Sequence, residues 1–113
     1  MTQVHVDENV VAELQDVMGE DFHVLLETFM DDSLNRVLAL QEALQQAAAE
    51  ELRQVAHSFK GSSGNIGAPH LYTLCQELEA LGRSGSVDGA DVLVEQLRQE
   101  LEEVERIMRG YLI

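Results

Sequence analysis

The sequence predicts an all-α protein, and three observations indicate this fold class. Aromatic residues make up only 4% of the 113 positions, and proline occurs once. Leucine and glutamate are the commonest residues, and alanine and glutamine are also abundant, which favours helix over sheet. Apolar residues recur at steps of three and four along most of the chain, the spacing of one helix face. Because 45% of the residues are hydrophobic, one continuous core is possible, and we predict a single domain over residues 1–113.

The first half of the chain predicts a short accessory helix followed by a long one. Asp7 can cap the accessory helix and Gly19 can end it; its apolar residues are Val10, Val11, Leu14, Val17 and Met18. The long helix is expected from Glu20 to about Ala47. Ser33 fills the one gap in its apolar face, which consists of Phe22, Leu26, Phe29, Val37, Leu40, Leu44 and Ala47.

A change of phase within residues 47–49 separates the long helix from a central helix that reaches Ile66. Gly67 can end this helix in the left-handed conformation. At about 100° per residue, one side of the helix is apolar. That side is expected to face the core and contains Leu52, Val55, Phe59 and Ile66, flanked by Ala56, Ser62 and Ser63.

Two further helices complete the pattern. Pro69 suits the first turn of the fourth helix, where its missing N–H needs no partner, and that helix is expected to end around Gly82. Ser86 or Asp88 is predicted to cap the last helix. Their apolar stripes are Leu71, Leu74, Cys75, Leu78 and Leu81, then Ala90, Val94, Leu97, Leu101, Val104, Met108 and Tyr111. We therefore predict an antiparallel four-helix bundle with a short N-terminal accessory helix covering one end.

The charge and cysteine content exclude several classes of protein. Twenty-one acidic residues against seven basic ones give a formal charge of −14, which repels nucleic acid and anionic membrane surfaces. Cys75 is the only cysteine, so neither an internal disulfide nor a thiolate metal cluster can form, and a reducing compartment suits the chain. The N-terminus lacks a basic, apolar leader and no run is long enough to span a membrane. We expect a soluble, cytoplasmic monomer.

The outward face of the central helix is unusual. It collects Arg53, Gln54, His57, Lys60, Gly61 and Gly64. Glycine inside a helix costs about 1 kcal/mol relative to alanine, and on this face neither glycine is expected to be needed for core packing. The two glycines therefore indicate that something outside the protein needs close access to His57.

The residues around His57 suit the transfer of a phosphoryl group. A neutral imidazole nitrogen is a good nucleophile, since the reference pKa of histidine is about 6.5. Lys60, the only lysine, stands one turn away and can offset the charge of the phosphoryl oxygens. Arg53 and Arg83 are expected to join it in a local positive patch on an acidic protein.

For one ring nitrogen of His57 to keep its lone pair, the other must donate its proton to a fixed acceptor. Tyr72, Gln76, Glu79 and Arg83 share one flank of the next helix, and an antiparallel return can lay this flank against His57. Glu79 is the predicted acceptor, with Gln76 as the alternative.

The run His57-Ser-Phe-Lys-Gly-Ser-Ser63, followed by Gly67-Ala68, closely resembles the H-x-x-K-G-S-S signature of histidine-containing phosphotransfer (HPt) domains. The helix pattern agrees over nearly the whole chain, and the likeness is greatest to small stand-alone HPt proteins of pseudomonads. The resemblance implies that His57 carries the phosphoryl group, Lys60 stabilises it, Gly61 admits a receiver domain, and Glu79, or else Gln76, holds the imidazole.

The same resemblance implies the partners, which are receiver domains of hybrid sensor kinases and a response regulator. Arg53, Gln54, Gly61, Gly64 and Arg83 are the expected docking residues, with apolar residues of the first two helices around them. Nothing resembles an ATP site, so the protein is expected not to phosphorylate itself. We expect no cofactor in this chain and Mg²⁺ on the partner receiver domain.

Two alternatives come from other classes. A degenerate HPt domain would bind a receiver as a helical adaptor without accepting phosphate. A bundle metalloprotein is a third possibility, because Glu20-x-x-His23 has di-iron spacing, but the sequence contains no second Glu-x-x-His. A nucleotide-binding loop is not expected either. Gly61-x-x-Gly64-x-x-Gly67 follows a helix rather than a strand and lacks the Gly-Lys-Ser/Thr ending of a phosphate-binding loop.

The remaining reactive residue types have no obvious role in the sequence. Cys75 lies on an apolar stripe, and His5 and His70 have no evident companions. We interpret these three as packing or surface residues, and the excess acidic residues as solvated helix faces.

Overall fold

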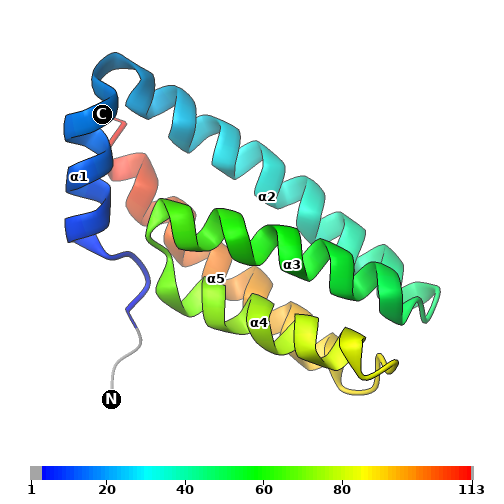
Figure 1. Ribbon diagram of the computed structural model, residues 1–113. Helices are drawn as coiled ribbons and strands as arrows, with labels where there is room; N and C mark the ends of the chain where they lie inside the picture. The colour runs from blue at the N-terminus through cyan, green and yellow to red at the C-terminus, as the bar shows by residue number, and fades with distance from the viewer. Residues whose placement is uncertain (1–3, 113) are drawn as a thin grey trace.

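A computed structural model describes residues 4–112, and these residues form helices and turns without a strand. The elements are α1 (Glu8–Met18), the 3₁₀ turn η1 (Gly19–Asp21), α2 (Phe22–Gln45), α3 (Ala49–Ile66), α4 (Pro69–Arg83) and α5 (Ala90–Gly110). In the bundle α2 packs on α3 and α5, and α4 packs on the same two helices, while α1 lies across one end (Figure 1). The predicted all-α fold and four-helix bundle are confirmed.

The accessory helix α1 begins as predicted, because the Asp7 carboxylate accepts hydrogen bonds from the backbone N–H groups of Asn9 and Val10. The Asp7 N–H in turn donates to the Gly67 carbonyl at 2.7 Å, which ties the N-terminal segment to the α3–α4 junction. Of the apolar residues in this helix, Val17 is 78% exposed and does not pack on the bundle. Because α1 has bundle neighbours on one side only, its packed face is narrow and centres on Val11.

The long helix is slightly shorter than expected at both ends. The η1 turn precedes it, so α2 begins at Phe22 rather than Glu20, and it ends at Gln45. Ala47 has φ of +51° and is exposed, so Ala43 takes its expected place in the buried face. A left-handed conformation at alanine is uncommon, which explains why the sequence carries no clear stop signal here.

The α3–α4 junction follows the predicted pattern. Gly67 ends α3 with φ of +84°, and Pro69 is the first residue of α4. A Cβ at Gly67 would lie 2.9 Å from Val10 Cβ, so the glycine also lets α1 approach the bundle.

The α4–α5 connection follows the prediction at the end of α4 and differs from it at the start of α5. Helix α4 ends at Arg83, one residue beyond Gly82. Gly82 is buried, and a Cβ there would lie 2.7 Å from the Ala49 carbonyl oxygen. The N-cap of α5 is Gly89, with φ of +84° and no side-chain bond, so neither predicted cap is used. Ser86 instead accepts the N–H of Asp88 in the preceding turn.

The apolar stripes of all five helices meet in one core. Val55, Leu44, Leu81 and Tyr111 lie at its edge and are partly buried. Cys75 is buried within it as predicted, and burial raises the pKa of its thiol to about 12. None of the helices in the described part of the chain is both long and apolar enough to cross a membrane. The largest side chains with no exposed surface are Phe59, Leu26, Leu40, Leu52, Leu71, Leu78, Leu97 and Met108.

Candidate functional site

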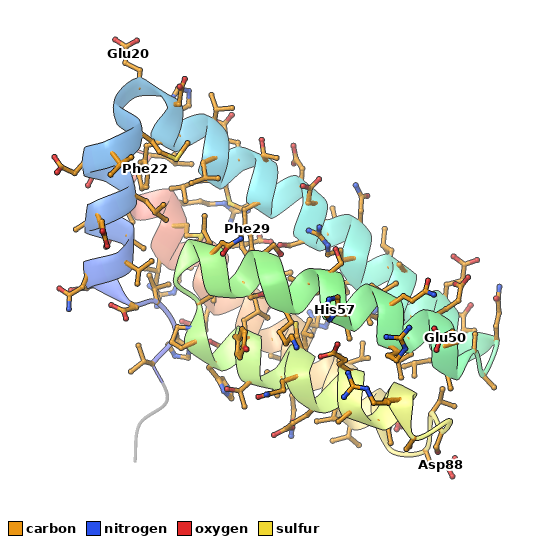
Figure 2. The ribbon with its side chains drawn as sticks, viewed as in Figure 1. Glu20, Phe22, Phe29, Glu50, His57 and Asp88 are labelled. Carbon is orange, nitrogen blue, oxygen red and sulfur yellow. The ribbon has the colours of Figure 1, made fainter. Side chains whose placement is uncertain are left out.

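His57 lies near the middle of α3 (Figure 2). The helix buries Leu52, Ala56 and Phe59 in the core, and this phase turns His57 outward. The side chain of His57 is 65% exposed, so a partner molecule can reach the ring from solvent.

A buried carboxylate on the neighbouring helix holds the exposed ring. Glu79 of α4 is only 3% exposed, and its Oε2 accepts a hydrogen bond from His57 Nδ1 at 2.5 Å. Its other oxygen, Oε1, accepts from Lys60 Nζ at 2.6 Å. Arg83 of α4 adds an ion pair to Oε2 at 3.4 Å. The structure thus brings together four residues singled out from the sequence.

The charge state of Glu79 fixes the tautomer of the imidazole. The Lys60 ammonium lowers the pKa of Glu79 most, and the hydrogen bond from His57 lowers it further, against the opposing effect of burial. An ionised carboxylate can only accept hydrogen bonds, so Nδ1 of His57 must carry the proton. In the neutral ring Nε2 then holds the lone pair, which makes it the nucleophilic nitrogen.

The alternative acceptor, Gln76, makes no hydrogen bond to the imidazole. Its side chain is exposed on α4 and makes no hydrogen bond to another residue that the structure describes. Glu79 occupies the position instead because it lies one turn closer to the C-terminus of α4, facing α3.

The two glycines of the motif have different surroundings. A Cβ at Gly61 would meet nothing within 4 Å, so this position is open to an approaching molecule. A Cβ at Gly64 would lie 3.2 Å from Cδ2 of Tyr72. Tyr72 is itself exposed, so Gly64 leaves room for an aromatic ring on the surface of α4 and is not required by the core, as was expected.

Arg53 and Gln54 are tied to a different carboxylate. Glu50, one turn earlier in α3, accepts hydrogen bonds from Arg53 Nε at 2.9 Å and Gln54 Nε2 at 3.2 Å. The Arg53 side chain lowers the pKa of Glu50 to about 2. Of the predicted positive patch, Lys60 and Arg83 gather at Glu79, whereas Arg53 is held by Glu50.

The sequence prediction missed Arg36 of α2. Its Nη2 donates to Ser58 Oγ at 3.2 Å, and its guanidinium lies 5.9 Å from the centre of the Phe59 ring. Arg36 therefore borders the site from the side opposite α4, next to His57 along α3. One sequence feature could have identified it: Arg36 is the only lysine or arginine before Arg53.

An apolar groove adjoins the site, with a volume of about 270 Å³. It lies between α1, α2 and α3, and Arg36 and Ser62 line it on the side toward the site. The groove lies where apolar docking residues of the first two helices were expected. Its apolar lining consists of Leu14, Met18, Leu25, Phe29 and Ile66.

The other histidines have no metal-like surroundings. His5 was expected to lack a companion, and this is wrong: its Nδ1 lies 2.8 Å from both carboxylate oxygens of Glu100, a buried residue of α5. His70 is half-buried, and its Nδ1 has no hydrogen-bond partner within residues 4–112. Within the same residues no three His, Cys, Asp or Glu side chains are grouped to hold a metal ion, and Glu20 and His23 are both exposed.

An outward imidazole, fixed by a buried carboxylate and flanked by cations on a helical bundle, defines a class of protein that takes an anionic group on nitrogen. Comparison with protein families narrows this class, because residues 24–107 match the Hpt domain. The chain belongs to the Hpt domain family and is a phosphotransfer protein of phosphorelays.

Solved structures agree with this assignment. The chain is 42% identical to histidine-containing phosphotransfer protein B (HptB) from Pseudomonas aeruginosa, with a TM-score of 0.94 over 97% of this chain and 96% of that chain. The predicted likeness to the HptB proteins of pseudomonads is thus confirmed. The comparison with curated proteins found no match.

More distant structures share the fold. The HPt domain of a hybrid histidine kinase from Shewanella is 22% identical, with a TM-score of 0.78 over 95% of this chain and 92% of that chain. The maize phosphotransfer protein ZmHP2 is 23% identical, with a TM-score of 0.84 over 95% of this chain and 88% of that chain.

Proposed function

We propose that His57 accepts a phosphoryl group from the receiver-domain aspartate of a hybrid sensor kinase and passes it to a response regulator. The observation that carries this proposal is the bond between His57 Nδ1 and Glu79. It commits the proton to one ring nitrogen and leaves the lone pair on Nε2 of a largely exposed ring.

The transfer needs no proton from solvent. The Nε2 lone pair attacks the phosphorus of the aspartyl phosphate, the N–P bond forms, the P–O bond breaks, and the aspartate leaves as a carboxylate. The phosphorylated ring keeps its Nδ1 proton and carries a positive charge, which the Glu79 carboxylate offsets. Transfer to the response regulator reverses these events: an aspartate oxygen attacks, the N–P bond breaks, and the electron pair returns to Nε2.

Lys60 and Gly61 assist in different ways. The Lys60 ammonium stands one turn from His57, where it offsets the charge of the transferring phosphoryl oxygens. At Gly61 the absence of a side chain lets the receiver come close to His57. The receiver docks over the apolar groove between α1, α2 and α3, with Arg53, Gln54, Gly64 and Arg83 at the edge of the contact.

The same proposal includes the metal ion, the oligomeric state and the cellular compartment. Mg²⁺ is bound by the acidic pocket of the receiver rather than by this chain, which needs no cofactor of its own. The protein acts as a monomer in the cytoplasm, where the reducing conditions suit its single buried thiol, Cys75.

A transfer assay tests this function. The protein is mixed with hybrid kinases charged by labelled ATP, and we expect an acid-labile, alkali-stable label on the wild type that is absent from His57→Gln. If several kinases give no label while their receivers still bind the protein, it is a non-catalytic adaptor and the proposal is wrong.

A further inference from the structure

Arg36 differs from every other basic residue that the structure describes. Six of the seven lysines and arginines lie in ion pairs with a carboxylate; these six are Arg53, Lys60, Arg83, Arg98, Arg106 and Arg109. Arg36 forms no ion pair with any carboxylate among residues 4–112, although the chain has 21 acidic residues. Asp32, one turn earlier in α2, lines the same groove as Arg36 but does not pair with it, so the guanidinium is available to an anion from outside.

Uncharged contacts hold the Arg36 guanidinium in place. Its Nη2 donates to the Ser58 hydroxyl at 3.2 Å, and the Phe59 ring lies beneath it at 5.9 Å. The negative face of an aromatic ring attracts a cation placed over it. These contacts orient the half-buried side chain without cancelling its charge. The guanidinium is therefore prepared to bind an anion at little further cost in side-chain entropy.

Arg36 also lies where two grooves meet. It lines the apolar groove between α1, α2 and α3, and it lines a second groove along the α2–α3 seam with Asn35, Ala39, Gln54, Val55 and Ser58. A partner that covers both grooves therefore also covers this arginine. Docking would remove water from the guanidinium, which strengthens its attraction for a carboxylate.

We propose that Arg36 binds a surface carboxylate of the docked receiver domain and so strengthens the docking of the receiver beside His57. This inference rests on the proposed phosphotransfer function. The phosphoryl group itself is left to Lys60, which stands one turn from His57 on the same helix, on the side facing α4.

The test separates docking from chemistry. Transfer from a phosphorylated receiver domain is followed at increasing receiver concentration for the wild type and Arg36→Gln. Losing a charge-assisted hydrogen bond should raise the KM about tenfold or more and leave the kcat nearly unchanged. The salt dependence of kcat/KM should also weaken, since one ion pair is lost.

Two comparisons sharpen the result. Arg106→Gln removes the same charge from α5, which does not contact α3, and should change the KM less than twofold. Phosphoramidate labels histidine without docking, since its P–N bond breaks and ammonia leaves, so Arg36→Gln should be labelled by it at the wild-type rate.

Each other outcome overturns the inference. An unchanged KM in Arg36→Gln, or an effect equal to that of Arg106→Gln, shows that no partner carboxylate binds there. A fall in kcat, or slower labelling by phosphoramidate, shows that Arg36 acts on the phosphoryl group instead. If Arg36→Gln unfolds, Arg36→Met places an apolar side chain against Phe59 and removes the charge together with the hydrogen bond to Ser58. A wild type that no receiver and no phosphoramidate labels would refute the phosphotransfer function itself, whereas a labelled wild type with an unaffected variant refutes only the role of Arg36.

Discussion

Two buried glutamates in this protein each hold a histidine through Nδ1. Glu79 of α4 holds His57, and Glu100 of α5 holds His5. The two carboxylates are similarly buried, with residue exposures of 3% and 6%. As isolated pairs they have the same chemistry, yet only one carries the features of a transfer site.

The difference lies in the surroundings of each pair. The His57 ring is 65% exposed, whereas that of His5 is 37% exposed. Glu79 also forms ion pairs with Lys60 and Arg83. Among the described residues, Glu100 forms no ion pair with a lysine or an arginine. Gly61 leaves open space beside His57. A histidine–glutamate pair therefore becomes a phosphotransfer site only where a partner can reach the imidazole and where cations lie close enough to offset the charge of the incoming phosphoryl group.

Replacing the two histidines should give the largest contrast. His57→Gln should abolish receiver-dependent labelling, because the nucleophile is lost, whereas His5→Gln should be labelled at the wild-type rate. Labelled ATP, a hybrid kinase and gel autoradiography measure both. Loss of label in His5→Gln, with its fold intact by circular dichroism, would place the second pair in the transfer machinery.

Replacing the two glutamates should give the next largest contrast. Glu79→Gln keeps an acceptor for Nδ1 but removes the charge that balances the phosphorylated ring, so transfer should slow by about 10–100-fold. Glu100→Gln serves as the matched control and should leave transfer within about twofold, since a change distant from the chemistry is usually near neutral. Rapid-quench kinetics with one receiver measures both rates, and equal rates for the two variants would contradict the distinction.

An added methyl group tests access to His57. Gly61→Ala meets open space in the free protein, so it should stabilise α3 by about 1 kcal/mol. It should nevertheless slow receiver transfer about tenfold, because small displacements of the reacting atoms are costly.

Labelling of Gly61→Ala by phosphoramidate should not change, because this donor needs no docking. Gly110→Ala adds the same methyl group into open space on α5 and is the control. Urea unfolding gives the stabilities. Undiminished receiver transfer in Gly61→Ala would show that the glycine does not serve the approach.

The two pairs should also differ in their effect on stability. His5→Ala leaves Glu100 buried without its partner, which should cost about 1–3 kcal/mol. His57→Ala should cost less, because Lys60 and Arg83 still neutralise Glu79. Urea denaturation at neutral pH compares the two, and a larger loss in His57→Ala would mean that the cations do not compensate.

Acid should remove the stabilisation that Glu79 provides. The folded-state pKa of Glu79 lies below its usual 4.5, so its ionised form stabilises the fold above pH 4.5, and this contribution is lost as the pH falls through the lowered pKa. The difference in unfolding free energy between the wild type and Glu79→Gln should therefore narrow below pH 4.5. Denaturation curves from pH 6 to pH 3 measure it, and a constant difference would mean that the carboxylate charge adds nothing.

The periodicity of apolar residues predicted the features of this molecule that depend on neighbouring residues in the chain. It predicted the helices and their apolar faces, the turn at Gly67 and Pro69, and a flank of α4 that includes Glu79. It could not predict contacts that depend on which helices become neighbours. Arg36 meets Ser58 across the α2–α3 seam, and His5 meets Glu100 at a separation of 95 positions.

The prediction of the N-cap of α5 was wrong for a different reason. Ser86 and Asp88 both suit an N-cap by residue type, but the chain uses them in the preceding turn and begins the helix after Gly89. Several adjacent residues with equal propensity leave the boundary to the packing of the whole helix, which composition does not encode.

Gly82 ties the reactive geometry to a position that has no side chain of its own and lies next to Arg83 in the chain. Its missing side chain lets α4 press against the backbone of Ala49 and Arg53, less than one turn from Glu79 along the same helix. A glutamate side chain is short, so its reach to His57 depends on this close approach. Anyone transplanting His57, Lys60 and Glu79 into another helical scaffold would therefore have to copy the glycine as well, because the spacing between the two backbones belongs to the catalytic design.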